Sequence, residues 1–311
     1  MITSPAFAGK SYAVLGLARS GLATVEALAA SGAEIMAWDQ SEDARASAAA
    51  KARIADPLAT SIYGFSGVVV SPGVPLNRHP IGPRAREAKV PVIGDIELFA
   101  QARPSLPPHR VVGITGTNGK STTTALIHHI LKSAGVPTTM GGNIGLPIMA
   151  QDPLPEAGVF VLELSSFQID LTQSLDCEVA ILLNVTPDHL DRYDGVDDYA
   201  ASKARLFAMQ SQEHVAVIAP EDEYSGAIAG QINGKLALVS SADVKDQSRW
   251  PALQGPHNAQ NVAAAVAAVR ALGVDDRAIA DALITYPGLP HRMERVAERN
   301  GVLFVNDSKA T

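Results

Sequence analysis

The sequence predicts an α/β protein built on parallel β-sheets, and three observations carry this prediction. Short apolar runs alternate with longer stretches of helical periodicity along most of the chain. Its 311 residues, 47% of them hydrophobic, are enough for two domains with cores of their own. The segment GITGTNGKST at 113–122 lies between an apolar run and a helix-like run, as does the turn that joins a strand to a helix in such folds.

The first elements form a βα series that we assign to an N-terminal domain, residues 1–103. We expect strands at 12–15, 34–38, 68–70 and 91–93, with a helix near 20–31. The segment RPSLPPH that follows is proline-rich and aperiodic, and a new strand begins directly after it. This indicates a domain boundary or a stiff linker.

The alternation resumes in a second region, which we assign to a central domain, residues 104–298. Its expected strands are 110–114, 159–164, 179–185, 214–219 and 235–240. Alanine-rich helices at 257–272 and 275–285 close this domain, and the segment YPGLP then breaks the pattern. The runs 293–296 and 302–305 predict a hairpin, and we interpret residues 299–311 as the start of an interrupted third domain.

Composition narrows the classes of partner. A net charge of −7 and an isoelectric point near 5.6 argue against a broad basic face, so we expect no nucleic-acid partner. The single cysteine, Cys177, excludes an internal disulfide and is interpreted as an inert buried thiol. With no leader-like start and no apolar run near the length of a membrane span, we expect a monomeric cytoplasmic protein without a membrane partner.

The turn at 113–122 has the chemistry of a phosphate-binding loop. Gly116 and Gly119 allow a tight turn whose N–H groups converge on phosphate oxygens, Lys120 adds a positive charge, and Ser121 adds a hydroxyl suited to Mg²⁺. The usual pattern has glycine where this chain has Ile114, so the match is partial. The alternative is a glycine-rich turn without catalytic meaning.

Two polar residues follow neighbouring strands of the central domain. Glu163 ends a strand that is otherwise apolar, the position where acidic residues hold Mg²⁺ beside a phosphate loop; the alternative is a pair with a nearby Arg or Lys. His189 lies on a loop that we expect at the same sheet edge, where it is either a ligand or a surface residue. Asn143, in the segment GGNIG, is a neutral donor nearby or a turn asparagine.

A lysine occupies the apolar face of the helix expected at 197–207. Lys203 shares that face with Tyr199, Leu206 and Phe207. A buried ammonium must be paired or lose its proton, and a neutral amine can react with CO₂ to give a carbamate with two oxygens for a cation. Glu163, His189 and Lys203 then converge on a second cation. The alternative is a lysine whose head reaches water.

The first βα turn indicates a nucleotide-like ligand in a Rossmann-like domain. Residues 16–21 follow a strand and open a helix, and Asp39 ends the next strand, as in dinucleotide-binding folds. Ala18 replaces the middle glycine of that pattern, and Gly73 lies on a loop at the same edge. The alternative is a purely structural turn.

Six segments together resemble the Mur ligases. These segments are GTNGKS at 116–121, ELSSFQ at 163–168, NVTPDHLDR at 184–192, HNAQN at 257–261, PHR at 290–292 and NDSKAT at 306–311. The resemblance covers residues 10–311 in order and is most detailed for the D-glutamate-adding branch. It implies a P-loop ATPase-like central domain and a third, Rossmann-like domain of which only the first strand region is present.

The resemblance implies an ATP-dependent amide ligase of peptidoglycan synthesis. The carboxylate of UDP-N-acetylmuramoyl-L-alanine attacks the γ-phosphate of ATP, and the amine of D-glutamate then opens the acyl phosphate. Two Mg²⁺ sites and a carbamate on Lys203 are part of this expectation. With the third domain interrupted, we expect the chain to bind the muramoyl nucleotide, to bind ATP weakly and to ligate poorly.

The resemblance also implies a role for individual residues. Those expected to bind ATP are Gly116, Thr117, Asn118, Gly119, Lys120, Ser121, Thr122, Asn258, Asn261, Arg292 and Asp307. Those expected to bind the other substrates are Ser20, Asp39, Gly73, Asn143, His189, Lys309 and Thr311. The metal ligands expected are Ser121, Glu163, His189 and carbamylated Lys203, and the catalytic residues are Lys120, His189, Lys203, Arg292 and Lys309.

Two other functions remain open from the sequence. One is a different ligase of the same superfamily, such as another Mur ligase or a folate polyglutamating enzyme. The other is a non-catalytic protein whose first domain binds NAD(H). Binding of a muramoyl nucleotide rather than NADH separates the first class from the second.

Overall fold

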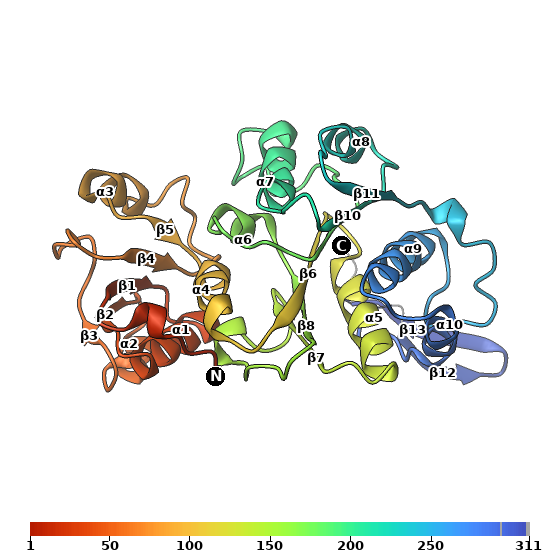
Figure 1. Ribbon diagram of the computed structural model, residues 1–311, viewed down its shortest axis with the longest axis horizontal. Helices are drawn as coiled ribbons and strands as arrows, with labels where there is room; N and C mark the ends of the chain where they lie inside the picture. The colour runs from red at the N-terminus through yellow and green to blue at the C-terminus, as the bar shows by residue number, and fades with distance from the viewer. Residues whose placement is uncertain (293, 309–311) are drawn as a thin grey trace.

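A computed structural model describes residues 1–292 and 294–308, and its main features are two parallel β-sheets (Figure 1). The N-terminal sheet has the strand order β3-β2-β1-β4-β5. Its strands are β1 (Ser11–Leu15), β2 (Glu34–Trp38), β3 (Arg53–Ile54), β4 (Gly67–Val70) and β5 (Val92–Ile93). The helices that connect them are α1 (Arg19–Ala30), α2 (Glu42–Ala48), α3 (Ile81–Ala88) and α4 (Asp95–Ala102).

The central sheet has the strand order β11-β10-β9-β6-β8-β7. Its strands are β6 (His109–Thr115), β7 (Thr138–Gly142), β8 (Gly158–Glu163), β9 (Val179–Leu182), β10 (Val215–Ile218) and β11 (Lys235–Leu238). All of these strands pair in parallel, so the residues that follow β6, β7, β8 and β9 meet at one edge. That edge is where open α/β sheets bind ligands.

Helices cover both faces of the central sheet. Figure 1 shows α5, α9 and α10 on one side and α6, α7 and α8 on the other. Their bounds are α5 (Lys120–Ser133), α6 (Ser166–Asp170), α7 (Val196–Ala208), α8 (Glu223–Ala229), α9 (Pro256–Ala271) and α10 (Asp276–Thr285). Short 3₁₀ turns are η1 (Pro5–Phe7), η2 (Arg103–Ser105), η3 (Ile148–Ala150) and η4 (Ser241–Asp243).

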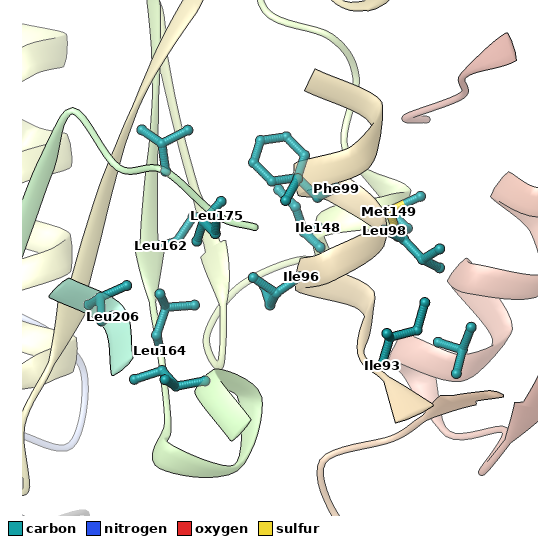
Figure 2. Packing of buried hydrophobic residues seen from close by; sticks show 14 of the residues in the cluster. Ile93, Ile96, Leu98, Phe99, Ile148, Met149, Leu162, Leu164, Leu175 and Leu206 are labelled. Carbon is teal, nitrogen blue, oxygen red and sulfur yellow. The ribbon is translucent and has the colours of Figure 1, made fainter. Parts of the chain in front are cut away.

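One apolar core runs from the N-terminal part of the chain into the central part. Phe99 of α4 packs edge-on against Phe160 of β8, with ring centroids 5.0 Å apart. Ile148 and Met149 of η3 are fully buried in the same cluster (Figure 2). Burial of side chains of this size stabilises the fold by roughly 1.5–3 kcal/mol each. The two sheets are therefore joined by packing as well as by the chain.

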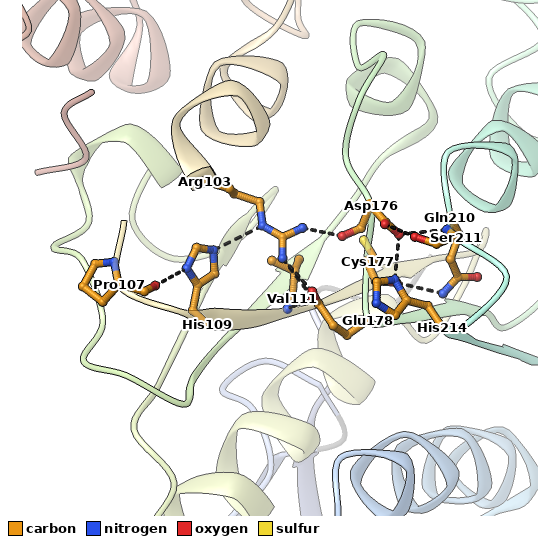
Figure 3. Close-up of polar contacts among 10 residues, drawn as sticks. All are labelled: Arg103, Pro107, His109, Val111, Asp176, Cys177, Glu178, Gln210, Ser211 and His214. Atoms are coloured by element: carbon orange, nitrogen blue, oxygen red, sulfur yellow. Dashed lines mark hydrogen bonds and ion pairs between the residues drawn. The ribbon is translucent and has the colours of Figure 1, made fainter. Parts of the chain in front are cut away.

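Polar contacts fasten the segment between the two sheets. The Arg103 guanidinium forms an ion pair with Glu178 at 2.8 Å and donates to Nε2 of His109 at 3.2 Å (Figure 3). Glu178 in turn accepts a hydrogen bond from the N–H of Val111 at 2.6 Å, at the start of β6. On α4, the buried Glu97 carboxylate accepts from the backbone N–H of Ser174 at 2.9 Å.

Strands β12 (Glu294–Arg299) and β13 (Val302–Asn306) form an antiparallel hairpin after the central sheet. Val296, Val302 and Phe304 on this hairpin are more than half exposed, at 62%, 57% and 52%. The sequence-based prediction of a hairpin here is confirmed.

The predicted strands and the helix at 197–207 are confirmed, with three corrections. The strand predicted at 179–185 ends at Leu182, because the N–H of Val185 bonds to the Asp222 carboxylate instead of a strand. The strand predicted at 235–240 ends at Leu238; after the N–H of Val239 bonds to Ile218, the next N–H on the β10 side, that of Ser241, bonds to the Glu221 carboxylate at 2.7 Å. The edge strands β3 and β7 were not predicted, since β3 has two residues and β7 ends in two glycines.

Candidate active site

The phosphate loop is the turn between β6 and α5. Gly116 and Gly119 have positive φ angles of 149° and 85°, which an L-residue rarely adopts. A Cβ atom on Gly119 would lie 2.2 Å from Oδ1 of Asn261, so a larger residue would both strain the backbone and displace that side chain. The glycines predicted for the turn are therefore required by backbone conformation and by space.

Residues after β9 hold the loop in place. The N–H of Thr117 bonds to the carbonyl of Asn184 at 2.9 Å, and the N–H of Asn118 bonds to Oδ1 of Asn184 at 2.8 Å. The hydroxyl of Thr117 accepts from the N–H of Thr186 at 3.0 Å. A loop fixed in this way keeps its shape without a ligand, which reduces the cost of ordering it on binding.

Lys120 lies over the loop that precedes it. Its Nζ donates to the carbonyl oxygens of Gly116 at 2.9 Å and Thr117 at 2.7 Å. Burial lowers the pKa of Lys120, and the carboxylates of Glu163 and Asp188 oppose that shift. Ser121 and Thr122, both partly buried, follow in the first turn of α5.

Glu163 is buried at the end of β8, beside the loop that follows β7. Its side chain is 2% exposed, and Oε1 accepts from Nδ2 of Asn143 at 3.0 Å. The N–H of Asn143 also bonds to the Glu163 carbonyl at 2.8 Å. Oε2 is buried and has no hydrogen-bond partner among the described residues. Within that part of the chain no Arg or Lys forms an ion pair with Glu163, so the predicted alternative is wrong there.

Lys203 is buried on α7, with 1% of the residue exposed. Its Nζ donates to the carbonyl of Gly116 at 3.0 Å and lies 4.3 Å from the centre of the Tyr199 ring. Burial lowers its pKa well below the ordinary value of a lysine, and the nearby Lys120 lowers it further. The predicted burial is confirmed, and the alternative of a side chain that reaches water is wrong.

His189 flanks the same Tyr199. Its ring centroid lies 6.1 Å from that of Tyr199 and 4.9 Å from that of Phe167, and its side chain is 45% exposed. The backbone of His189 is left-handed, with φ of 54°. Nε2 of His189 lies 3.6 Å from Oδ2 of the neighbouring Asp188. His189 and Lys203 therefore approach Tyr199 from two elements.

Two further predicted residues, Arg292 and Asn261, lie against the start of α5, and a third, Asn258, bonds to Asn261. A guanidinium N–H of Arg292 donates to the Ser121 hydroxyl at 3.3 Å. Asn261, on α9, is 4% exposed and lies against Gly119, and its amide donates to Oδ1 of Asn258 at 3.2 Å.

The last three predicted residues, Asp307, Lys309 and Thr311, come after β13 in the chain. Asp307 is exposed after β13. Lys309 and Thr311 lie outside the described residues.

A cavity of about 510 Å³ opens in the N-terminal part of the protein, at the carboxyl ends of β1 and β2. Gly16, Asp39 and Gly73 line it, with Trp38 and His79. The Asp39 carboxylate accepts from the N–H groups of Leu17 at 2.6 Å and Ser41 at 2.8 Å. Asp39 therefore holds the two loops of the cavity in position.

Ser20 does not line this cavity. It lies in the first turn of α1, beside a smaller void that also contacts Asp95.

Comparison with known proteins decides the family. The model of the Mur ligase middle domain matches residues 114–253. The UDP-N-acetylmuramoylalanine--D-glutamate ligase of Sphingopyxis alaskensis is 66% identical over 314 residues, which cover 100% of this chain and 72% of that protein. The enzyme of the same name from Zymomonas mobilis is 58% identical, over 100% of this chain and 74% of its own length. This chain belongs to the Mur ligase family.

Solved structures show the same fold at low identity. MurF from Acinetobacter baumannii has a TM-score of 0.60 and 21% identity, over 89% of this chain and 64% of that one. UDP-N-acetylmuramate-alanine ligase from Thermotoga maritima has a TM-score of 0.54 and 20% identity, over 96% and 74%. This Mur ligase therefore has the predicted α/β architecture.

In this Mur ligase the predicted residues fall into two groups. One surrounds the phosphate loop and contains Lys120, Ser121, Glu163, Asn143, Lys203, His189, Arg292, Asn258 and Asn261. The other, Asp39 and Gly73, lines the N-terminal cavity. Among the described residues no three His, Cys, Asp or Glu side chains form a cluster that could hold a metal ion. Every helix in that part of the chain is also too short or too polar to traverse a bilayer.

Sequence reasoning missed the residues that join these two groups. A guanidinium N–H of Arg19 donates to the carbonyl of Gly145 at 3.0 Å, next to the Asn143 loop. Arg192 bonds to the carbonyl of Val74 at 3.1 Å, beside the N-terminal cavity. Arg19 begins α1 directly after the first βα turn and Arg192 lies on a loop, and the sequence context of neither distinguishes it from a surface charge.

Proposed function

We propose that this Mur ligase forms the amide bond between the carboxyl group of UDP-N-acetylmuramoyl-L-alanine and the amine of D-glutamate, at the expense of ATP, in peptidoglycan synthesis. The relatives that match the whole chain at 58% and 66% identity bear the name of that reaction. The observation that carries the site assignment is the buried Oε2 atom of Glu163, which has no hydrogen-bond partner within the described part of the chain and lies beside a preformed phosphate loop.

The residues of the phosphate loop fit the triphosphate of ATP. The N–H groups at the start of α5 and the ammonium of Lys120 supply positive charge to the β- and γ-phosphates. Arg292 adds a second cation next to Ser121. Asn258 and Asn261, at the first turns of α9, are proposed to meet the adenine, and Asp307 the ribose.

Oxygen ligands of the loop fit Mg²⁺. Glu163 Oε2 and the hydroxyl of Ser121 are hard oxygen donors of the kind that Mg²⁺ prefers. Bound there, the cation would neutralise charge on the phosphates. His189 and a carbamate on Lys203 are proposed to serve a second Mg²⁺.

The proposed chemistry has two steps. A carboxylate oxygen of the muramoyl nucleotide attacks the γ-phosphorus, and the bond from that phosphorus to ADP breaks. The amine of D-glutamate then attacks the acyl carbon, inorganic phosphate leaves, and the amine loses a proton. In the first step Lys120 and Arg292 stabilise the negative charge on the phosphate oxygens.

Asn143 and His189 are proposed to position the muramoyl end of the substrate, and Asp39 and Gly73 its uridine diphosphate end. Ser20, whose helix begins at the same βα turn, is proposed to act with them on the diphosphate.

Lys203 has the features of an amine that takes up CO₂. Because burial lowers its pKa, a larger fraction carries a free electron pair at neutral pH. The nitrogen attacks CO₂, an N–C bond forms, and one proton leaves the nitrogen. ¹³C NMR of the protein in ¹³C-bicarbonate tests this: a carbamate resonance that disappears in K203M is expected. A spectrum of wild-type protein without that resonance contradicts the carbamate.

Titration calorimetry with UDP-N-acetylmuramoyl-L-alanine and, separately, with NADH tests the substrate class. We expect heat of binding for the muramoyl nucleotide and none for NADH. Tight binding of NADH without a response to the muramoyl nucleotide would contradict the proposed function and favour a nucleotide-binding protein without ligase chemistry.

A further inference from the structure

Two loops from different sheets lie against each other beside the candidate site. Residues 72–78 follow β4 of the N-terminal sheet, and residues 188–193 follow β9 of the central sheet. Asn77 Nδ2 and a guanidinium N–H of Arg78 both donate to the carbonyl oxygen of Asp191, each at 3.1 Å. A guanidinium N–H of Arg192 donates in the opposite direction, to the carbonyls of Val74 at 3.1 Å and Pro72 at 3.4 Å.

Arg192 also contacts the aromatic residues that surround His189. The guanidinium carbon lies 4.1 Å from the centre of the Phe167 ring, close enough for a cation–π contact. The Phe167 ring is 4.9 Å from His189 and is stacked on Tyr193 with an interplanar angle of 11°. The Arg192 side chain therefore makes two kinds of contact. Its N–H groups donate to the loop 72–78, and its guanidinium plane packs on Phe167, which in turn contacts His189.

His189 needs such support. Its φ of 54° is a left-handed conformation that costs a non-glycine residue roughly 1 kcal/mol or more. Its side chain is 45% exposed, so burial alone does not fix the ring. The imidazole lies against Phe167 and is carried by the loop 188–193; Arg192 belongs to that loop, its N–H bonds to the His189 carbonyl at 2.9 Å, and its guanidinium contacts Phe167.

One of the two residues whose carbonyls Arg192 contacts, Val74, lines the N-terminal cavity, and the other, Pro72, directly precedes the lining residue Gly73. Gly73, Val74 and Pro75 line the cavity of about 510 Å³ together with Gly16 and Asp39. A ligand that orders the segment 72–75 also orders the acceptors of Arg192. The guanidinium of Arg192 is planar and rigid, so a shift of the carbonyls it binds also shifts the plane that packs on Phe167.

We propose that Arg192 is a positioning residue that couples occupancy of the N-terminal cavity by a nucleoside diphosphate sugar to the placement of His189 at the phosphate loop. The inference rests on the proposed function in one respect, the nature of the ligand in the cavity. Its consequence is thermodynamic: each ligand raises the affinity for the other, by the same factor.

The test is a linkage measurement on the whole chain. Calorimetry gives the dissociation constant of Mg²⁺ with a non-hydrolysable ATP analogue, alone and with saturating UDP-N-acetylmuramoyl-L-alanine, and the reverse titration gives the same factor independently. In wild type we expect a factor of about 5 or more, the lower end of ordinary allosteric coupling. In R192M we expect the factor to fall to within about twofold of one, while each ligand alone binds nearly as in wild type.

A second variant and a control distinguish coupling through the contact between the loops 72–78 and 188–193 from local damage to the fold by the R192M substitution. N77A removes a donor to Asp191 from the other side of the contact and leaves Phe167 untouched, so it should also lower the factor. R205M removes an arginine that bonds to the Thr172 carbonyl within the central part at 3.2 Å, and it should keep the wild-type factor.

Each other outcome has a defined meaning. A wild-type factor of one, or a wild-type factor retained in both R192M and N77A, overturns the role of Arg192. Failure of the muramoyl nucleotide to bind to wild type overturns the proposed function instead, so the two failures are separate.

Discussion

The Nζ atom of Lys203 donates a hydrogen bond to the carbonyl oxygen of Gly116, at 3.0 Å. This bond joins α7, on one face of the central sheet, to the first residue of the phosphate loop. The amine has no carboxylate in an ion pair among the described residues and is 1% exposed. A group in this position destabilises the fold when it carries a proton, which makes its retention a sign of function.

Replacement of Lys203 by Met should remove a pH dependence of stability. The folded pKa of Lys203 is lowered, so between that pKa and 10.5 the unfolded chain binds more protons than the folded one. The free energy of unfolding of wild type therefore rises with pH through that window. K203M should lack this rise. The free energy of unfolding of K203M minus that of wild type should therefore be larger at pH 7 than at pH 10. Urea unfolding at several pH values in CO₂-free buffer measures this difference. K132M, on the exposed face of α5, is the control. The same dependence of unfolding free energy on pH in K203M and wild type would contradict the prediction.

E163Q should separate stability from metal-dependent binding. Glutamine keeps an acceptor for Asn143 but removes a buried charge, so without Mg²⁺ the free energy of unfolding should rise. The affinity for a Mg²⁺–ATP analogue should fall by about 10- to 100-fold, the usual cost of altering a metal site. Urea unfolding and calorimetry measure the two effects. E156Q, at an exposed carboxylate before β8, should change neither; unchanged affinity in E163Q would exclude Glu163 as a ligand.

G119A should distort the phosphate loop. A methyl group there would lie 2.2 Å from Oδ1 of Asn261, and the φ of 85° is unfavourable for alanine. We expect a loss of about 1–3 kcal/mol in the free energy of unfolding and weaker nucleotide binding. G226A is the matched control, because it lies within α8, has nothing within 4 Å of the added atom and should stabilise the helix slightly. Wild-type stability and affinity in G119A would refute the loop geometry.

D95N tests a buried acid behind the N-terminal loop. Burial raises the pKa of Asp95 to about 6, so the folded protein binds its proton more tightly than the unfolded chain between pH 3.8 and about 6. The contribution of the protonated acid is present below pH 3.8 and is lost as the pH rises through about 6. Asparagine keeps the acceptor for the N–H of Ile96 and is neutral at every pH. The free energy of unfolding of D95N minus that of wild type should therefore be about 2–3 kcal/mol larger at pH 7 than at pH 4.

Denaturation curves at the two pH values measure this gain. The exposed D281N provides the reference for a carboxylate outside the core. An equal effect of D95N at both pH values would show that Asp95 is not the group that titrates.

Much of the fold follows from local patterns in the sequence. Strands such as β8 and β9 are short apolar runs between helices, and their length and their place in the alternation predict buried strands of a parallel sheet. The burial of Lys203 was predictable because helical spacing alone places it with Tyr199 and Leu206. The phosphate loop was predictable because its glycines are required by the backbone.

Other features depend on contacts that the sequence does not encode locally. The ends of β9 and β11 are set by the carboxylates of Asp222 and Glu221, which compete for backbone N–H groups. Asn184 supports the phosphate loop from 66 positions away, and Arg192 reaches across 118 positions to Val74. Such contacts are fixed by how the two sheets pack, so no periodicity or motif announces them.

Anomalous scattering from crystals soaked with Mn²⁺ and a non-hydrolysable ATP analogue tests the central claim most directly. We predict a Mn²⁺ peak that is coordinated by Glu163 and Ser121, with the terminal phosphates of the nucleotide over residues 116–121. An empty phosphate loop, or a nucleotide and cation bound away from Glu163, would contradict the account.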